Sequence, residues 1–285
     1  MLTVAVEGVT LCYAESGAGQ AVVFVHGIPT DYRAWNAQVG PFSKNYRVIT
    51  YSRRHAQPNN NQNALLDSTI QNNAKDLEGL IEKIANPPVH LVGHSYGGFI
   101  AAYLAANAPE LIRKLILIEP GISTLLIKDP ESRAQMLSLL LRSPSTALAA
   151  GSYIRRYYNP MLEAYRKGDL DLALKYFLDG IMNKPGVLDQ LPGNVQSMLK
   201  DNALTIGEVE TKLPAFTMKD TSKISAPTLL MHGANGTKIF RAIVKELAKS
   251  IPNSEVVTIP DSSHFPHFEN AERFNEKVLE FLSRD

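Results

Sequence analysis

The chain has almost no cysteine and no pattern of metal ligands. Cys12 is the single cysteine among 285 residues, so no disulfide can form within the chain and no cysteine cluster can hold a metal ion. It lies in a strand-like segment, where a small core residue is expected. No set of histidines and carboxylates has the spacing of a metal site, and no Gly-x-Gly-x-x-Gly or P-loop pattern that would bind a nucleotide occurs. The sequence therefore predicts a protein that works without a cofactor.

The sequence also lacks a strong charge and any long apolar run. Lysines and arginines number 29 against 28 aspartates and glutamates, a net charge of +1, which gives no reason to expect nucleic acid or an anionic membrane as a partner. No apolar run reaches the length of a membrane span, and the first residues lack the basic, apolar and small-residue order of a signal peptide. We therefore expect a cytoplasmic protein with no nucleic-acid or membrane partner.

Short apolar runs alternate with helical patterns over the first part of the chain. The run at 21–25 is apolar at every position, which is typical of a strand buried on both faces of a sheet. Over 67–85, by contrast, apolar residues recur at helical spacing up to a pair of prolines. Strands that alternate with helices indicate an α/β fold, in which helices flank a mostly parallel sheet. The expected strands are 2–13 (a hairpin split at Glu7 and Gly8), 21–25, 47–51, 89–92, 114–118, 226–231 and 254–259.

The alternation stops between residues 122 and 222. Helical patterns fill this stretch, prolines separate them, and no convincing strand occurs. We therefore predict a core of residues 1–121 and 223–285 with a helical cap, or lid, at 122–222. The cap is rich in leucine, methionine and tyrosine, which favours an apolar substrate pocket, although such residues also pack a cap onto its core. The expected cap helices are Glu131–Arg142, Thr146–Tyr158, Met161–Lys167, Leu170–Met182 and Val195–Leu204.

The strongest motif lies where the run at 89–92 meets a helix of small residues. Gly93-His94-Ser95-Tyr96-Gly97 matches the Gly-x-Ser-x-Gly pattern in its expected setting of strand, sharp turn and helix. Such a turn holds the serine in strained backbone geometry, and the two glycines let strand and helix approach without side-chain clashes. The hydroxyl then stands above the end of the sheet, with a helix N-terminus beneath it. Ser95 is therefore predicted to be a catalytic nucleophile rather than part of an ordinary glycine-rich turn.

The histidine that would activate this serine is expected near the C-terminal end of the chain. A serine nucleophile needs a base within hydrogen-bond reach, and the base needs an acid that orients it. In this kind of fold the three residues follow the order serine, acid, histidine, which places the base in a loop after the last strand. His264, in the segment 260–266, occupies that place. His267 is the alternative, but it lies closer to the final helix, where a helix-start or surface histidine is expected.

Taken together, the motifs resemble those of α/β-hydrolases of the esterase, haloalkane dehalogenase and epoxide hydrolase type. The matching stretches are His26-Gly27-Ile28-Pro29, Gly93–Gly98 and His264-Phe265-Pro266, and the likeness covers nearly the whole chain. It implies a mostly parallel eight-stranded sheet with the helical cap inserted after the sixth strand. It also implies an oxyanion hole formed by the backbone amides of Ile28 and Tyr96.

The acid departs from the pattern that is commonest in this family. That pattern has an aspartate three residues after the glycine of His232-Gly233, and here Gly236 occupies the position. Some members carry their acid at the end of the strand that follows the nucleophile helix, where this chain has Glu119. An open α/β sheet binds its ligand at the carboxyl ends of its strands, so Glu119 lies at the correct edge and is the predicted acid. The remaining alternatives are Asp261 and the cap residues Glu208 and Asp220.

These residues predict a cofactor-independent serine hydrolase that cleaves a carboxylic ester or a lactone through an acyl-enzyme. Dehalogenases and epoxide hydrolases of the type that the chain resembles have an aspartate in place of Ser95, so halide displacement is not expected. Two alternatives use the same residues, namely a hydrolase of carbon–carbon bonds and a perhydrolase. A third is a receptor with the hydrolase fold that senses a ligand. The expected partner is a small apolar ester-like substrate, and the oligomeric state is left open.

Overall fold

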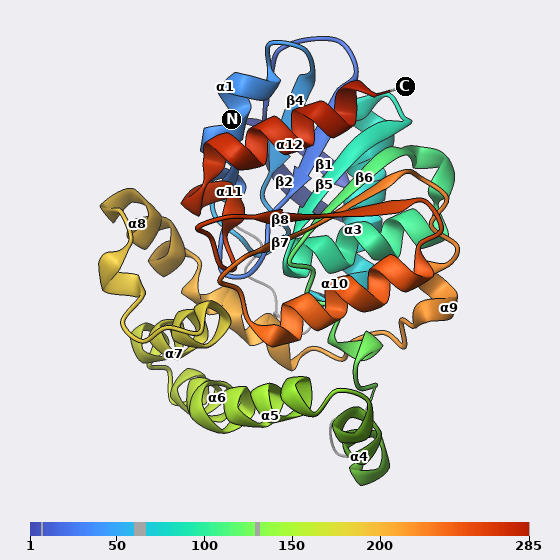
Figure 1. Cartoon of the computed structure of the whole chain (residues 1–285). Helices are drawn as coiled ribbons and strands as arrows, with labels where there is room; N and C mark the ends of the chain where they lie inside the picture. Colours follow the sequence, from blue (N-terminus) through green and yellow to red (C-terminus); the bar gives the residue numbers. More distant parts are fainter. Residues whose placement is uncertain (7, 60–66, 129–131, 285) are drawn as a thin grey trace.

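Figure 1 shows the fold in a computed structural model, which describes residues 1–6, 8–59, 67–128 and 132–284. Within these residues, eight strands form one sheet in the order β1-β2-β4-β3-β5-β6-β7-β8. β2 pairs antiparallel with β1 and β4, and the other pairings are parallel. The predicted α/β class and the mostly parallel sheet are therefore confirmed. The strands are β1 (Leu2–Val6), β2 (Val9–Ser16), β3 (Ala21–Val25), β4 (Arg47–Tyr51), β5 (Val89–His94), β6 (Ile112–Ile118), β7 (Thr228–Gly233) and β8 (Ser254–Ile259).

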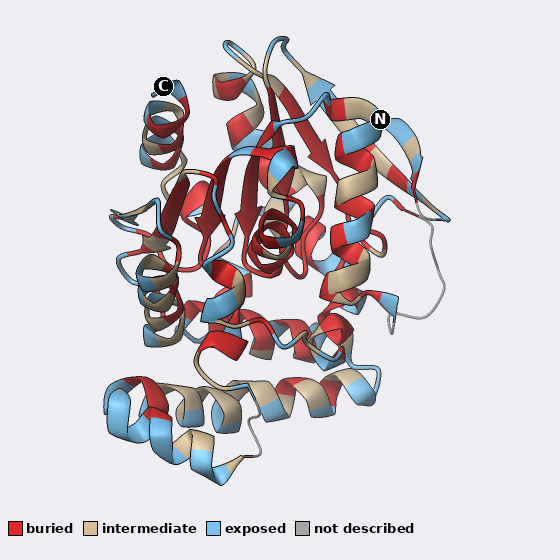
Figure 2. Ribbon diagram, turned by 90° about the vertical axis from the view of Figure 1, so that its right-hand side faces the viewer, coloured by how far each residue is buried: buried red, intermediate tan, exposed pale blue. Residues whose placement is uncertain are grey.

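The central strands are buried on both faces, as Figure 2 shows in red. Every residue of β3 and β5 is buried. Because successive side chains of a strand point to opposite faces, Val23 and Leu91 join one apolar cluster whereas Phe24 and Val92 join another. Strands with two buried faces need apolar residues at every position, which explains the continuous runs in the sequence.

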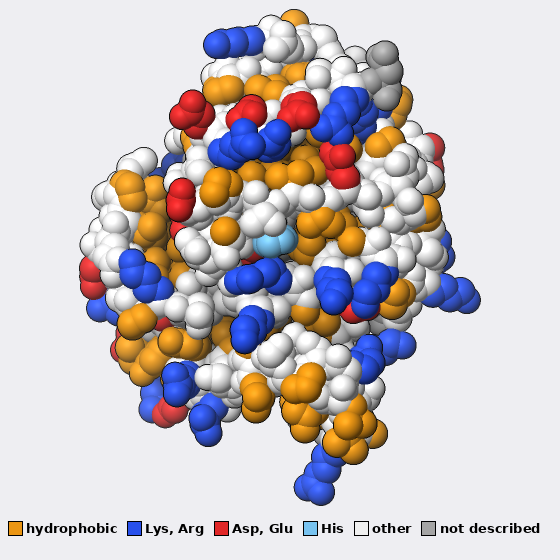
Figure 3. Space-filling model, in the orientation of Figure 1, with side chains coloured by type: hydrophobic (Ala, Val, Ile, Leu, Met, Phe, Trp, Pro, Cys, Tyr) orange, Lys and Arg blue, Asp and Glu red, His pale blue; other side chains and the backbone are white. Residues whose placement is uncertain are grey.

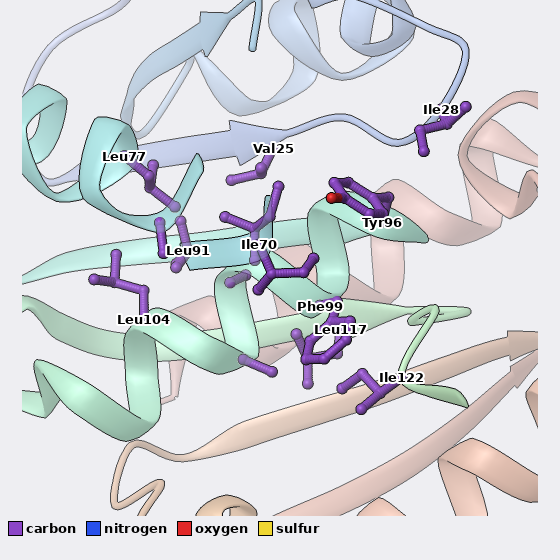
Figure 4. Close-up of a cluster of buried hydrophobic side chains, with 14 of the residues drawn as sticks. Val25, Ile28, Ile70, Leu77, Leu91, Tyr96, Phe99, Leu104, Leu117 and Ile122 are labelled. Carbon is purple, nitrogen blue, oxygen red and sulfur yellow. The ribbon is translucent and has the colours of Figure 1, made fainter. Parts of the chain in front are cut away.

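Each face of the sheet has its own set of helices. α2, α3 and α10 share one apolar cluster with the sheet, and Figure 4 shows part of it around Phe99. α1 and α12 share the other cluster, in which Phe42 and Phe274 are fully buried. The layers leave the carboxyl ends of the parallel strands at one common edge. The helices of the two layers are α1 (Asn36–Phe42), α2 (Ile70–Leu80), α3 (Tyr96–Asn107), α10 (Lys238–Ser250), α11 (Pro266–Glu269) and α12 (Ala271–Ser283).

In its described part, the chain between β6 and β7 consists of helices joined by turns and irregular segments, with no strand. Figure 1 shows α4 to α8 gathered on one side of the sheet layers, with α4 at their outer end, whereas α9 lies beside α10. None of the helices in the described part of the chain has the length and apolar character that crossing a bilayer requires. The α-helices of this segment are α4 (Arg133–Arg142), α5 (Pro144–Tyr153), α6 (Asn159–Arg166), α7 (Leu170–Met182), α8 (Gly193–Asp201) and α9 (Met218–Thr221). Shorter helical turns are η5 (Ser123–Leu125), η6 (Ile154–Tyr158), η7 (Leu188–Gln190) and η8 (Ala203–Glu210).

The sequence predictions and the structure differ mainly at the ends of helices. The helix expected over 67–85 begins only at Ile70, where Thr69 caps it, and its last turn is a π-helix, Ile81–Ala85. Glu131, where a cap helix was expected to begin, and Glu7 of the hairpin lie outside the described residues. Helix ends depend on capping contacts that apolar spacing does not encode.

Candidate active site

Ser95 lies in the tight turn between β5 and α3. Its φ of 52° is in the left-handed region, which a residue with a side chain adopts under strain. The flanking glycines are required by close contacts. A Cβ at Gly93 would lie 2.6 Å from the carbonyl oxygen of Gly97, and a Cβ at Gly97 would overlap the carbonyl oxygen of His26. The motif therefore lets strand, helix and the loop after β3 close tightly around the serine.

Three side chains that lie far apart in the sequence meet beside this turn. The Ser95 hydroxyl lies 3.0 Å from Nε2 of His264. On the other side of the ring, Nδ1 of His264 lies 3.3 Å from Oε2 of Glu119. The side chains of His264 and Glu119 are fully buried. With a proton on Nδ1, the imidazole donates to the carboxylate and accepts from the hydroxyl, and this arrangement suits a general base.

Glu119 follows the last residue of β6 and points its carboxylate across the edge of the sheet. Its backbone is also left-handed, with a φ of 44°. The second oxygen, Oε1, accepts a hydrogen bond from the amide of Gly233 at 3.0 Å. Burial raises the pKa of Glu119, and the hydrogen bond from Gly233 opposes that rise. A Cβ at Gly236 would lie 2.9 Å from Oε1, so the Glu119 carboxylate fills the space in front of the position where the family's usual aspartate would begin.

The loop after β8 fixes the ring of His264. Nε2 of His94 lies 2.8 Å from the carbonyl oxygen of His264, to which it donates a hydrogen bond. The ring of Phe240, from α10, lies 4.3 Å from the His264 ring. Burial lowers the pKa of His264, because an imidazolium would be poorly solvated there. The ring is therefore neutral at neutral pH and able to accept a proton.

His267, the alternative base, packs against the rings of Trp35 and His94. Its ring centre lies 4.7 Å from that of Trp35 and 4.5 Å from that of His94. Neither of its ring nitrogens has a hydrogen-bond partner among the described residues, and burial lowers its pKa. Of the two candidates, the structure brings His264 to Ser95.

The alternative acids are exposed or engaged elsewhere. Asp261 is exposed. Asp220 forms the capping box at the start of α9, and Glu208 pairs with a buried arginine. In the described part of the chain, the carboxylate within bonding distance of the His264 ring is that of Glu119. The same part contains no group of histidine, cysteine and carboxylate residues that could hold a metal ion.

The peptide between Gly27 and Ile28 is held from one side. Its carbonyl oxygen accepts hydrogen bonds from the Thr30 hydroxyl at 3.0 Å and from an Arg53 guanidinium nitrogen at 3.4 Å. Because the C=O and N–H of a trans peptide point in opposite directions, these contacts turn the Ile28 amide the other way. A Cβ at Gly27 would lie 2.9 Å from the Cβ of Ser95, so this peptide lies directly against the serine.

Tyr96 provides the other predicted oxyanion-hole amide. It is the first residue of α3, and the first amides of a helix have no partner within the helix. Among the described residues, neither the Ile28 nor the Tyr96 amide donates a hydrogen bond to another protein group. Figure 4 shows both residues at the same end of the apolar cluster. Two amides next to a nucleophile and without protein acceptors can stabilise a negatively charged oxygen.

A buried ion pair ties the helical segment to this turn. Arg53, in the loop after β4, lies 2.7 Å from Glu208 of η8, and both side chains are fully buried. The guanidinium lies 5.0 Å from the centre of the Tyr96 ring, and Glu208 also accepts from the Ser68 hydroxyl at 2.8 Å. The sequence does not predict this pair. Its only local signal is the doublet Arg53-Arg54 at a strand end, which is typical of a solvated surface.

Removal of one partner of the Arg53–Glu208 pair should destabilise the folded protein. Arg53→Met leaves the Glu208 carboxylate buried without its cation, and we expect the free energy of unfolding to fall by about 3–5 kcal/mol. Urea unfolding followed by the fluorescence of Trp35 measures the change. Arg53→Met with Glu208→Leu should recover much of the loss, since no charge is then left unpaired.

A matched control is Arg47→Met, which breaks the partly exposed pair of Arg47 with Glu15. Exposed pairs contribute little, so the expected loss is below about 1 kcal/mol. Equal losses for Arg53→Met and Arg47→Met would contradict a special role of the buried pair.

The fold and these contacts define a class of protein. A mostly parallel sheet that carries a serine on a sharp strand–helix turn, next to a histidine from the last loop, is the architecture of the α/β-hydrolases. The model of the Alpha/beta hydrolase family matches residues 22–277, and the chain belongs to this family.

Similar proteins cover almost the whole chain. The AB hydrolase superfamily protein YfhM of Bacillus subtilis is 25% identical over 97% of this chain and 95% of its own length. A 2-hydroxy-6-oxononadienedioate/2-hydroxy-6-oxononatrienedioate hydrolase of Burkholderia vietnamiensis is 25% identical over 95% of this chain and 90% of its own length. The crystal structure of the enol-lactonase from Burkholderia xenovorans LB400 has a TM-score of 0.66 at 22% identity, over 99% of this chain and 100% of that chain. At this identity, the likeness to the enol-lactonase shows that the two chains share a fold.

Proposed function

We propose that the protein is a serine hydrolase in which Ser95 is the nucleophile, His264 the general base and Glu119 the acid that orients His264. The observation that carries this proposal is the 3.0 Å separation between the Ser95 hydroxyl and Nε2 of His264, two groups 169 residues apart in the sequence. A hydroxyl on a strained turn beside a buried, neutral imidazole is a nucleophile whose base is already in place. The chemistry needs no cofactor.

The proposed reaction has two stages. Ser95 attacks the acyl carbon while its proton passes to Nε2 of His264, and Glu119 stabilises the imidazolium that forms. The amides of Ile28 and Tyr96, at the positive end of α3, stabilise the negative oxygen of the tetrahedral intermediate. The imidazolium then gives its proton to the departing alcohol, which leaves an acyl-enzyme. Water attacks the acyl-enzyme with the same base and releases the acid and the free serine.

We infer that the substrate is a small apolar carboxylic ester or lactone. In this proposal residues 1–121 and 223–285 form the catalytic core, and residues 122–222 form the cap that covers the substrate. One contact supports an apolar surrounding near the base, since Phe240 packs on the ring of His264. A second contact brings the helical segment to the same loop, because the sulfur of Met182, from α7, lies 3.2 Å from the hydroxyl of Ser263. The name of the structural neighbour from Burkholderia xenovorans, an enol-lactonase, agrees with this class.

Hydrolysis of a carbon–carbon bond is the second candidate. The Burkholderia vietnamiensis relative is named after oxo-dicarboxylates, whose names contain no ester linkage. A substrate with two carboxylates needs cations in its pocket. Arg53 packs on the Tyr96 ring, but its guanidinium is already paired with the Glu208 carboxylate. It is therefore not free to bind a substrate carboxylate, and this favours the ester proposal.

Labelling with a fluorophosphonate, followed by a substrate screen, tests the proposal. We expect one label per chain, on the peptide that contains Ser95, and turnover of p-nitrophenyl esters or lactones. The chain length at which the rate falls measures the depth of the acyl pocket. Cleavage of an oxo-dienoate without ester turnover would favour the second candidate. Absence of both labelling and turnover would refute a hydrolase and favour a ligand receptor.

The activity should fall on the acid side in a single-proton step. Burial raises the pKa of Glu119 and lowers that of His264, so the first proton that the pair takes up on acidification enters the carboxyl. A protonated Glu119 donates to Nδ1 of His264, which shifts the ring proton to Nε2 and removes the acceptor for the serine proton. We therefore expect kcat/KM to fall tenfold per pH unit, beginning above the usual glutamate pKa of about 4.3. A profile that is flat from neutral pH down to that value would contradict this assignment.

A further inference from the structure

The helix at the outer end of the helical segment turns an apolar stripe to solvent. Leu137, Leu140 and Leu141 of α4 are 56%, 42% and 76% exposed. Their i, i+3 and i+4 spacing places them on one face of the helix, opposite the buried Leu139. Leu148, on the adjoining α5, is 69% exposed. Figure 3 shows hydrophobic side chains gathered at this end of the molecule, over α4. An amphipathic helix normally turns such a stripe toward the core.

The charged residues of α4, α5 and η6 are all arginines. From residue 132 to 162 the sequence contains four arginines and no aspartate or glutamate. Arg133 precedes Leu137 by one helical turn and therefore lies on the same face of α4. Arg133, Arg142, Arg155 and Arg156 are all exposed, and no ion pair joins them to any described residue. The net charge of the whole chain is +1, so it does not reveal this local excess of arginine.

The stripe and its charges together limit what can cover it. A symmetric dimer would bring the two sets of arginines together, and α4, α5 and η6 carry no carboxylate to pair with them. The four leucines also expose only a few hundred Å², about half of the ~800 Å² per partner that a stable protein interface buries. An anionic bilayer suits both the small apolar area and the positive charge of this surface. Leucines enter the boundary between headgroups and acyl chains, and arginines bind the lipid phosphates.

We propose that α4 and the start of α5 dock the protein on the surface of a membrane that contains anionic phospholipid. The docking is peripheral and needs no membrane-spanning helix. It goes beyond the proposed hydrolase activity and does not depend on it. Because the stripe and the arginines act together, binding requires both apolar insertion and negative lipid charge, and it weakens as salt screens the arginines.

Vesicle co-sedimentation with the full chain tests the proposal. Vesicles of phosphatidylcholine with about 30% phosphatidylglycerol are compared with pure phosphatidylcholine, at about 50 mM and about 500 mM salt. We expect binding to the anionic vesicles, at least tenfold weaker binding to neutral vesicles, and weaker binding at high salt. Leu137→Ser with Leu141→Ser should lower the affinity for anionic vesicles at least tenfold, because two insertion sites are lost.

The matched control is Leu172→Ser with Leu204→Ser. These two leucines belong to the same helical segment and are 41% and 56% exposed, but they lie outside α4 and α5. Their replacement should leave vesicle binding unchanged. All four substituted leucines are exposed. Both double variants should therefore keep the wild-type melting temperature, measured by circular dichroism.

Three results would overturn the proposal. The first is no binding to anionic vesicles at low salt, and the second is equal binding to neutral and anionic vesicles. The third is a concentration-dependent dimer in sedimentation velocity that the α4 double variant abolishes, which would make the stripe an interface between two copies of the chain.

Discussion

Ser95→Ala is expected to lower kcat for ester hydrolysis by a factor of about 10⁴–10⁶ and to leave KM nearly unchanged. The hydroxyl is the only group that the substitution removes, and it lies 3.0 Å from Nε2 of His264, the proposed base. The binding groups stay in place, because the contacts of Gly93 and Gly97 hold the backbone of the turn. The Tyr96 amide belongs to that backbone, and the Ile28 amide belongs to the loop after β3. Because these amides remain, we expect the variant to hydrolyse the ester faster than the uncatalysed reaction in water.

The measurement is steady-state turnover of the best p-nitrophenyl ester from the screen, with fluorophosphonate labelling of the same preparations. Ser145→Ala is the matched control, because this serine is exposed on α5, outside the site. It should keep full activity and full labelling. If Ser95→Ala kept more than about 1% of the wild-type rate, or were still labelled, another group would be the nucleophile.

The sequence predicts the positions of these groups because each one comes after the end of a strand. Ser95 follows β5, Glu119 follows β6, and His264 lies in the loop after β8. In a parallel sheet all these ends lie at one edge, so a correct strand order along the chain already brings the side chains to the same side. The apolar runs supply that order, because strands buried on both faces leave little room for polar residues.

Features that depend on exposure or on pairing across the chain cannot be read from the same patterns. Arg53 and Glu208 are polar residues of irregular segments, and only the fold shows that both are buried against each other. Leu137 and Leu141 fit the helical spacing expected of a packed cap helix, yet they face solvent. Apolar spacing identifies the face of a helix but does not say what covers it.

Glu119→Gln is expected to lower kcat by about 10²–10⁴-fold, with a smaller change in KM. The carboxylate accepts two hydrogen bonds, one from the Gly233 amide and one from Nδ1 of His264. A glutamine of the same shape has a single acceptor oxygen. If that oxygen serves Gly233, the amide group of the glutamine faces Nδ1 and favours the tautomer of His264 that cannot accept the serine proton. Kinetics of the purified variant measure the loss, and urea unfolding checks that it is folded.

The pH profile separates this orienting role from a loss of packing. In Glu119→Gln the carboxyl no longer takes up the first proton, and burial keeps the pKa of His264 low. The acid limb of the residual activity should therefore move to lower pH than in the wild type. A variant with full activity would place the acid elsewhere. A variant with low activity and an unchanged acid limb would assign Glu119 a structural role only.

A swap of the acid between two strand ends gives the sharpest test of this reasoning. The space in front of Gly236 is filled by the Glu119 carboxylate, so Gly236→Asp alone should force two carboxylates together and reduce both activity and stability. Glu119→Gly with Gly236→Asp removes that conflict and offers His264 a carboxylate from the end of β7, and we expect at least a tenfold gain in kcat over Glu119→Gly alone. Recovery would mean that the imidazole needs a negative charge at this point in space, whichever strand supplies it. A double variant no better than Glu119→Gly would mean that the hydrogen bond from Gly233 and the left-handed turn at residue 119 are needed to hold the carboxylate in position.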